Sequence, residues 1–239
     1  MIKVTYLFHS GYMVETDNYH LIFDYITDNC NKKNRECGRL CKEELHDGKK
    51  TAAFVSHAHC DHYDKSVLKL GDDISFIMSD DVKPPDVHKL KLCHPYETWT
   101  DDGLKVMTFG STDQGVSFYV EADGYRVFHA GDLNWWHWEG ESKAEQEDAK
   151  KRFFAEIEKI KKLDIQIAMF PVDPRLEHAY YYGGKSFIEE VKPDIFFPMH
   201  FQGSYMTTRK FKKMMGEGKT KIYEINRRFE EFSLTDKIK

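Results

Sequence analysis

The sequence predicts an α/β protein in which two β-sheets pack face to face with helices on the outside. Short apolar or alternating runs, which favour strands, cluster in the first half of the chain. In the second half such runs alternate with amphipathic helical patterns, an order typical of layered folds. A chain of 239 residues with 41% hydrophobic composition can bury one sizeable core, so we expect a single domain over residues 1–239.

The first half holds strands on both sides of a histidine-rich segment. Asp-Gly pairs at 102–103 and 123–124 mark tight turns, and a short helical pattern covers residues 64–70. The predicted strands are residues 2–8, 12–16, 20–25, 51–56, 74–79, 104–109, 115–122 and 125–131.

The second half begins with a predicted amphipathic helix over about residues 141–163. Its apolar residues, such as Phe153 and Ile157, recur at helical spacing on a charged background and leave one solvated face. Beyond this helix we predict strands over residues 164–171, 194–200, 221–225 and 230–234, and helices over residues 185–192 and 208–215.

Charge and hydropathy restrict the classes of partner. The net charge of -5 and the pI near 6.2 show no basic excess, which disfavours a general nucleic-acid binder. No apolar run approaches the length that spans a bilayer, and the first residues lack the basic and apolar regions of a secretory signal. We therefore expect a cytoplasmic protein without a membrane partner.

The five cysteines form an odd set without a pairing pattern, which fits reduced thiols in the cytosol. Cys30, Cys37 and Cys41 lie in a polar insertion over about residues 28–50. A small metal site formed with His46 is one interpretation of this cluster. Because no Cys-x-x-Cys pair is present, we prefer free thiols.

The segment FVSHAHCDHYD concentrates metal-ligand chemistry between His57 and His62. His57 and His59 are two apart in the loop that leaves a predicted strand, so their imidazoles can meet one cation. Asp61 and His62 follow where the chain turns toward a helix, and they can face a second cation. A single histidine is more often a core or surface residue, but four such residues at this spacing indicate a metal site.

This HxHxDH pattern resembles the signature of the metallo-β-lactamase superfamily, and the resemblance extends over nearly the whole chain. HSGYMVE at 9–15 and HLIFD at 20–24 are similar to the family's opening segments. HAGD at 129–132 is similar to its motif with a metal-bridging aspartate, and PMH at 198–200 to its final ligand motif. The order is most similar to the branch of ascorbate-6-phosphate lactonase and related cytosolic hydrolases. The resemblance implies an αββα four-layer sandwich with the site at the mouth between the sheets.

The chemistry of two further ligands agrees with the resemblance. Asp132 follows a glycine that allows close backbone approach, and its two carboxylate oxygens can bridge two cations. His200 ends an apolar strand, a position where a lone histidine has few other roles.

One ligand position departs from the family pattern. Members normally carry another histidine before the bridging aspartate, and here that region reads FGSTDQGVSFYV. Our hypothesis is that Asp113 supplies the missing ligand; the alternative is that Asp113 only shapes the STDQG turn. The first cation would then be held by His57, His59, Asp113 and Asp132, and the second by Asp61, His62, Asp132 and His200.

The expected cofactors are two divalent metal ions. A carboxylate in place of an imidazole hardens the first site, so Mn²⁺ or Fe²⁺ competes better with Zn²⁺. Asp61 is the candidate catalytic residue, because it can orient a metal-activated water or collect its proton. His9 and Asp24 resemble family residues that support the ligands from behind, and we place His129 with them.

Two loops offer candidate substrate contacts. GDLNWWHWEG places Trp135, Trp136 and His137 near the expected mouth, where the tryptophans form either a substrate wall or core packing. In PVDPRLEHAYYYGG, Arg175 either clamps a phosphate or carboxylate or pairs with a neighbouring acidic residue to fix its loop. His129, His137 and His178 are candidates for a general acid, although a supporting position behind the ligands or a surface position is the commoner outcome for each.

These observations favour a metal-dependent hydrolase that cleaves an ester, lactone or phosphoester bond of a small polar molecule. A nuclease of the RNase Z type is disfavoured by the acidic balance and by the lack of an RNA-binding arm. A non-catalytic sensor or scaffold of the same fold is the alternative that the missing histidine suggests. A di-iron oxidoreductase is less favoured, since no flavodoxin domain fits in this length.

Overall fold

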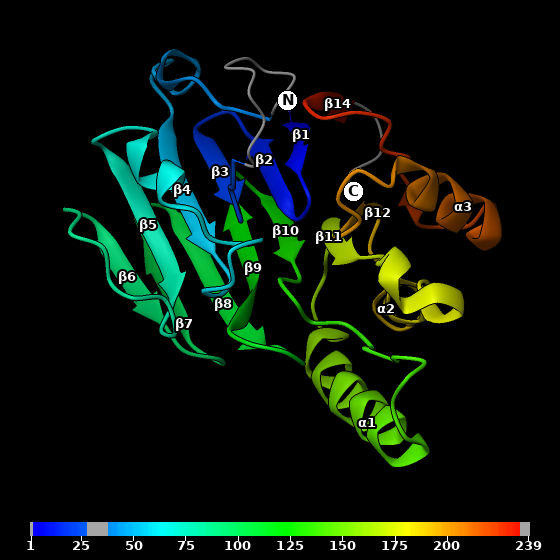
Figure 1. Ribbon diagram of the computed structural model, residues 1–239. Helices are drawn as coiled ribbons and strands as arrows, with labels where there is room; N and C mark the ends of the chain where they lie inside the picture. The colour runs from blue at the N-terminus through cyan, green and yellow to red at the C-terminus, as the bar shows by residue number, and fades with distance from the viewer. Residues whose placement is uncertain (1, 28–37, 235–239) are drawn as a thin grey trace.

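The computed structural model describes residues 2–27 and 38–234, and two sheets pack face to face in it (Figure 1). The first sheet has the strand order β14-β1-β2-β3-β4-β5-β6, and the second has the order β13-β12-β11-β10-β9-β8-β7. The first sheet consists of β1 (Ile2–Phe8), β2 (Gly11–Glu15), β3 (Tyr19–Phe23), β4 (Lys50–Val55), β5 (Ile74–Ser79), β6 (Leu90–Cys93) and β14 (Glu230–Leu234). The second consists of β7 (Thr98–Asp101), β8 (Leu104–Gly110), β9 (Val116–Ala122), β10 (Tyr125–His129), β11 (Ile167–Pro171), β12 (Ile195–Met199) and β13 (Lys221–Ile222).

Helices flank the sheets, so the predicted sandwich fold is confirmed. They are α1 (Lys143–Ile160), α2 (Tyr182–Val191) and α3 (Tyr205–Met215), with short 3-10 turns η2 (Lys42–Leu45), η3 (Lys65–Lys69) and η4 (Pro174–Ala179). The α-helices cover the second sheet. Helix α1 contacts β8 and α2 contacts β11, and the ring centroid of Phe211 in α3 lies 5.4 Å from that of Phe196 in β12. The outer side of the first sheet is covered by the short turns η2 and η3, which bury Leu45 and Val67 against it. No α-helix lies over this sheet in the part of the chain that the structure describes.

The long helix α1 begins directly after its cap residue, Ser142, and ends at Ile160, inside the predicted range of 141–163. The Ser142 hydroxyl accepts a hydrogen bond from the Glu145 amide, and the Glu145 side chain accepts one from the Ser142 amide. Phe153, Ile157 and Ile160 form its buried face, as their spacing predicts. None of the helices in the described ranges has the length and apolar character needed to cross a membrane.

The cysteine insertion is described only in part. Cys30 and Cys37 lie outside the described residues, and so does the possible metal site built on them. Cys41 is an exposed free thiol, and His46 is exposed beyond η2.

Candidate metal centre

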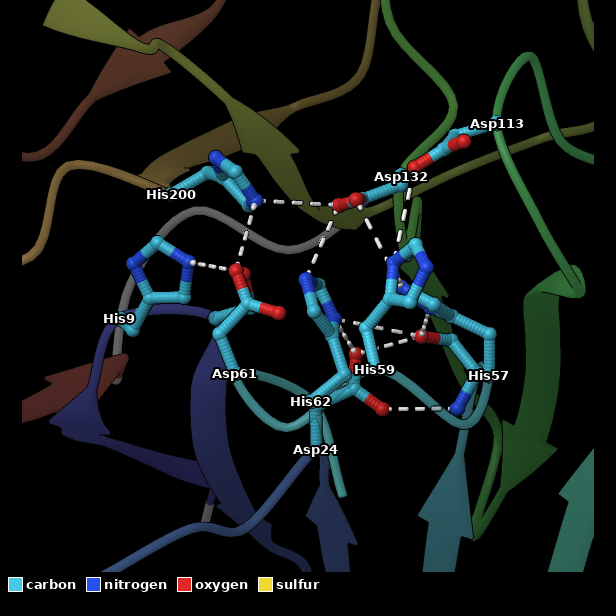
Figure 2. Close-up of polar contacts among 12 residues, drawn as sticks. His9, Asp24, His57, His59, Asp61, His62, Asp113, Asp132 and His200 are labelled. Carbon is cyan, nitrogen blue, oxygen red and sulfur yellow. Dashed lines mark hydrogen bonds and ion pairs between the residues drawn. The ribbon is translucent and has the colours of Figure 1, made fainter. Parts of the chain in front are cut away.

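The candidate ligands lie at the ends of strands from both sheets. In the first sheet β1, β3 and β4 run in one direction, and their carboxyl ends lead to His9, Asp24 and His57. In the second sheet β10 and β12 lead to Asp132 and His200. Because the carboxyl ends of parallel strands meet at one sheet edge, the two edges bring these side chains together (Figure 2).

The backbone at this edge adopts unusual conformations. His9, Asp24 and His200 have φ values of 56°, 42° and 65°, in the left-handed region that non-glycine residues rarely adopt and that concentrates at functional sites. Gly131, with φ of 53°, lies so close to Ser56 that a Cβ would be 2.8 Å from the Ser56 Cβ. A glycine is therefore required before Asp132.

The first cluster consists of His57, His59, Asp113 and Asp132, whose ligand atoms all lie within 4.8 Å of one another. His57 Nε2 is 3.1 Å from His59 Nδ1 and 3.6 Å from Asp132 Oδ2. Asp113 Oδ2 is 3.6 Å from His59 Nδ1. The side chains of His59 and Asp113 are 41% and 44% exposed, so this cluster opens to solvent.

The second cluster consists of His9, Asp61, His62 and His200, again within 4.8 Å. His62 Nε2 and His200 Nε2 lie 3.0 and 3.2 Å from Asp132 Oδ1. Asp61 Oδ2 is 3.4 Å from His9 Nε2 and 3.9 Å from His200 Nε2. Asp132 therefore turns one carboxylate oxygen toward each cluster.

The donor atoms fit a divalent cation. His62 Nε2, His200 Nε2 and Asp132 Oδ1 are buried and have no hydrogen-bond partner in the described part of the chain. Two ligand atoms about 2.1 Å from a cation at a tetrahedral angle are about 3.4 Å apart. The separations of 3.0 to 3.6 Å from Asp132 lie around that value.

Hydrogen bonds on the far side of the rings decide which nitrogen faces the second cluster. His62 Nδ1 is 2.6 Å from Asp24 Oδ2, and His200 Nδ1 is 2.9 Å from Asp173 Oδ2. A carboxylate only accepts, so each Nδ1 carries the proton and donates it. The Nε2 lone pairs are then directed at the cluster, as in carboxylate–histidine–metal arrangements.

Asp24 also orients the first cluster from behind. It accepts hydrogen bonds from the Ser56 amide at 2.8 Å and the Ser56 hydroxyl at 2.7 Å, and this hydroxyl lies 2.9 Å from His57 Nδ1. His129 Nε2 is 2.9 Å from the Ser10 carbonyl oxygen, and its Nδ1 is 3.9 Å from Asp24. The structure thus places Asp24 and His129 behind the ligand rings.

His9 lies beside the ligands and faces Asp61. The Gln202 amide donates to His9 Nδ1 at 3.3 Å, so a neutral His9 carries its proton on Nε2, which points at Asp61. Burial lowers the pKa of His9 to about 4, so its ring is neutral at pH 7. The His9 Nε2 to Asp61 Oδ2 separation of 3.4 Å is a close polar contact rather than a formed hydrogen bond, and it places His9 beside the ligand atoms of the second cluster.

Without a cation, protons compensate the charges of the centre. Burial alone would lower the pKa of His200, but Asp132 and Asp173 outweigh it and raise the pKa to about 9. Burial likewise opposes charge on His62, yet Asp132 and Asp24 hold its pKa well above the usual value. For Asp132, burial would raise the pKa, and the charges of His62 and His200 bring it well below the usual range.

A cavity of about 780 Å³ opens over both clusters. Trp136 forms part of its wall: its Nε1 donates to the Asp132 carbonyl oxygen at 3.0 Å, and its ring lies 5.5 Å from that of His200. The Trp138 ring stacks on it at 5.9 Å. The lining residues are His59, Asp61, Thr112, Asp113, Asp132, Trp136, Trp138, Glu141, Ala144, Glu145, Asp148, Ala149, Arg152, Arg175 and His200.

The structure does not bring Trp135, His137 and His178 to this cavity lining. The Trp135 ring packs 6.2 Å from that of Phe153, in the core under α1. The His137 and His178 rings lie 6.0 Å apart and both pack near Tyr182. Of this loop, Trp136 and Trp138 line the cavity, and a hydrogen bond from the His137 amide to the Trp135 carbonyl oxygen at 2.9 Å bends the backbone between them.

Arg175 lines the cavity and also pairs with an acidic neighbour. Its Nε and Nη2 donate to Asp173 at 2.9 and 2.6 Å, the loop-fixing arrangement that the sequence left open. Asp173 is fully buried and binds His200 Nδ1, so Arg175 is linked to a candidate ligand through one carboxylate.

Sequence reasoning missed three residues of the centre. Ser56 is the first residue after β4 and Asp173 the second after β11, at the edge that carries the ligands, and this place in the chain could have indicated both residues. Arg152 reaches the cavity from α1 and donates to the Thr112 carbonyl oxygen at 2.9 Å. Its role depends on how α1 packs, for which the local sequence holds no signal.

Comparisons with known proteins agree on the fold. A family model described as a beta-lactamase superfamily domain matches residues 3–150. The chain is similar to Igni18, a metallo hydrolase from the archaeon Ignicoccus hospitalis (TM-score 0.62, 19% identity, covering 98% of this chain and 99% of that one). It is also similar to YhfI, a metallo-beta-lactamase fold protein from Bacillus subtilis (TM-score 0.62, 12% identity, covering 97% and 98%).

A third similar structure is CmlA, a diiron beta-hydroxylase from Streptomyces venezuelae (TM-score 0.59, 9% identity, covering 83% of this chain and 44% of that one). No curated protein matches the sequence. At these identities the structural likenesses establish the fold.

Proposed function

The chain belongs to the beta-lactamase superfamily, and from this premise we propose that it is a metal-dependent hydrolase with a binuclear centre. The observation that carries the proposal is that Asp132 turns one oxygen to His57 and the other to His62 and His200. We assign one divalent cation to His57, His59, Asp113 and Asp132, and the other to Asp61, His62, Asp132 and His200.

Divalent cations bound in this way supply Lewis acidity and lower the pKa of water at the centre. Asp61 is placed to accept a hydrogen bond from a water at the centre, because it borders the cavity and its side chain is 37% exposed. The neighbouring His9 lowers the pKa of Asp61, so its carboxylate is ionised near neutral pH and is a weak base. We therefore assign Asp61 the role of orienting this water, with His9 beside it.

The donor set bears on which metal is used. Asp113 takes the place of an imidazole at the first site, and a carboxylate shifts preference from Zn²⁺ toward Mn²⁺ or Fe²⁺. CmlA, described as a diiron enzyme, shares the fold at low identity, so the fold is compatible with iron. We propose Zn²⁺ or Mn²⁺ as the working metals, with Fe²⁺ as the third candidate.

The substrate we propose is a small polar ester, lactone or phosphoester, as in the ascorbate-6-phosphate lactonase branch. A cavity of about 780 Å³ has the size of small-molecule sites. Arg175 has an Nη1 group left after its bonds to Asp173, which suits a phosphate or carboxylate of the substrate. Cysteines without a pairing pattern support a cytoplasmic setting.

A non-catalytic metal sensor or scaffold is the second candidate. The observation that favours it is the exposure of His59 and Asp113, since two solvated ligands hold a cation weakly.

Elemental analysis of purified wild type and Asp113→Ala tests the proposal, with Asp148→Ala as the matched control. Asp148 also lines the cavity but belongs to neither cluster. We expect two metals per chain in wild type and control, one in Asp113→Ala, and metal-dependent turnover in an ester, lactone and phosphoester panel. Two tightly bound metals in Asp113→Ala would remove Asp113 from the ligand set. Full occupancy with no turnover across the panel would favour the sensor.

A further inference from the structure

One segment of the chain carries a charge opposite to that of the rest. Residues 205–228 hold eight Lys or Arg and two Glu, a net charge of +6. Since the whole chain has a net charge of -5, the remaining residues carry -11. The acidic overall balance therefore hides a local basic surface.

Helix α3 presents this charge on an outward face. Met206, Arg209, Lys210 and Lys213 are spaced i, i+3, i+4 and i+7 and so share one side of the helix, and all are exposed. The opposite side buries Phe211 against the second sheet. Figure 1 shows α3 at the periphery of the molecule, with the outward side clear of both sheets.

The same helix exposes two large apolar side chains. The exposed large hydrophobic residues of the described chain are Tyr96, Met206 and Met214, with Met206 54% and Met214 39% exposed. The two methionines are eight residues apart, which corresponds to about 12 Å along a helix. Apolar groups thus flank the lysines at both ends of the face.

The chain after α3 adds to the basic surface. The Ile225 amide donates to the Thr208 hydroxyl at 3.1 Å, and Arg209 pairs with Glu224 at 2.7 Å, so residues 224–226 are fixed along the helix. The exposed Arg227 follows directly.

The lysines of the face are available to a partner. Lys210, Lys212 and Lys213 make no ion pair with the residues that the structure describes, although all three are exposed. An acidic partner would therefore meet these ammonium groups without displacing an existing contact.

We propose that the outward face of α3 docks on a lipid bilayer surface that carries anionic headgroups. Lysines on an amphipathic helix attract anionic lipid, and exposed apolar side chains beside them insert at the boundary of headgroups and acyl chains. Single-stranded nucleic acid would be met by aromatic stacking platforms, and the exposed apolar groups of this face are methionines. This proposal replaces the expectation of no membrane partner, which rested on the lack of a spanning segment. A spanning segment is needed to cross a bilayer and is not needed to dock on its surface. The proposal is independent of the hydrolase assignment.

Vesicle cosedimentation of the full chain tests this inference. Mixed phosphatidylglycerol and phosphatidylcholine vesicles are compared with phosphatidylcholine alone, at low and high salt. Each cation near an anionic surface contributes about 1 kcal/mol, about fivefold in affinity, so Lys210→Gln/Lys213→Gln is expected to bind about 30-fold more weakly. The matched control is Lys151→Gln/Lys162→Gln, which removes two exposed lysines from α1 and its end.

The expected pattern is binding to the mixed vesicles, weakened by salt and by the α3 variant and unchanged in the control. Met206→Ser is expected to weaken the residual binding at high salt, where apolar insertion dominates. Equal binding to both vesicle types, no binding to either, or equal loss in the two lysine variants would overturn the proposal. The proposal is also overturned if the protein does not bind vesicles but binds a duplex or single-stranded RNA in a manner that depends on Lys210 and Lys213. Far-UV circular dichroism of each variant establishes that the fold is retained.

Discussion

Replacing Asp24 by asparagine perturbs the second cluster without touching a candidate ligand. Asp24 is fully buried and accepts hydrogen bonds from the Ser56 amide at 2.8 Å, the Ser56 hydroxyl at 2.7 Å and His62 Nδ1 at 2.6 Å. Asparagine has nearly the same shape, but an NH₂ group replaces one acceptor oxygen. If this group faces His62, the ring must accept through Nδ1 and carry its proton on Nε2. That proton then points at Asp132 and competes with a cation.

The magnitudes follow from these contacts. Loss of an orienting partner of a ligand histidine typically costs 10- to 100-fold in metal affinity, about 1.4 to 2.7 kcal/mol. In the metal-free protein, loss of a hydrogen bond to a charged group costs about 1.5 to 3 kcal/mol of unfolding free energy. Calorimetric titration with Zn²⁺ or Mn²⁺ measures the first effect, and urea unfolding in the presence of a chelator measures the second.

Asp123→Asn is the matched control. Asp123 accepts bonds of similar length from the Thr16 hydroxyl at 2.7 Å and from the Asn18 amide at 2.8 Å, in a turn remote from the clusters. This variant is expected to lose stability and keep both metal affinities. If Asp24→Asn binds two cations as tightly as wild type, the hydrogen-bond partner of Nδ1 does not decide which nitrogen of His62 carries the proton. The proposed role of Asp24 in directing the Nε2 lone pair to the cation is then wrong.

Three further predictions concern stability and protons. In Gly115→Ala a Cβ would lie 2.0 Å from the Ser56 carbonyl oxygen at a φ of +69°, so urea unfolding should show a loss of at least about 3 kcal/mol, against about 1 kcal/mol for Gly124→Ala, where the space is open. Burial lowers the pKa of His200, but neighbouring carboxylates raise it to about 9 in the metal-free protein. Its stabilising effect should be complete below the unfolded pKa of about 6.5 and disappear as the pH rises through about 9, as thermal unfolding with chelator would show. Glu156→Gln weakens the hydrogen bonds that Glu156 accepts from the Tyr96 hydroxyl at 2.6 Å and the Gly110 amide at 3.2 Å. The free energy of unfolding measured in urea should therefore fall by about 1 to 2 kcal/mol, while the metal affinities measured by titration stay unchanged.

Strand and helix patterns predict most of the fold, and the exceptions have a physical cause. The runs of buried strands such as β11 and β12 are apolar throughout and are readily recognised. The edge strands β6 and β7 read LKLC and TWTD, and each is only four residues long, too short for a pattern to mark it as a strand. Cys93 is the one residue of the two strands that is buried. Their strand conformation comes from pairing with β5 and β8, which local sequence does not encode.

The centre shows the same division between local and tertiary signals. His57, His59, Asp61 and His62 are adjacent in sequence, so their convergence was predictable from spacing, and the structure brings them together. Trp136 lines the cavity, whereas Trp135 packs against the core beside Phe153. The backbone between them is bent by a hydrogen bond from the His137 amide to the Trp135 carbonyl oxygen, so a simple alternation of side chains does not predict which tryptophan faces the cavity.

The tertiary part of the centre depends on contacts between segments far apart in sequence. The hydrogen bond that His200 Nδ1 donates to Asp173 joins the ends of neighbouring strands, β11 and β12. The proton on His9 Nε2 depends on an amide of residue 202, which lies on the other sheet's side of the centre. The partners of each contact are far apart in the sequence, so no local spacing predicts either contact. Only the packed structure shows them.

Each proposed cation joins the two sheets, which links metal binding to the packing between them. One cluster combines His57 of the first sheet with Asp132 of the second, and the other combines His62 with His200 and the same Asp132. A ligand present at 100 times its dissociation constant stabilises the folded state by about 2.7 kcal/mol, so each proposed cation would act as a cross-link between the sheets. In the metal-free state the raised pKa values of His62 and His200 supply positive charge beside Asp132, which limits the repulsion that an empty centre would suffer. Under the proposed assignment, metal uptake would exchange cations for protons across the sheet interface. Because Asp132 faces both clusters, a cation at one site would change the charge that the other site experiences.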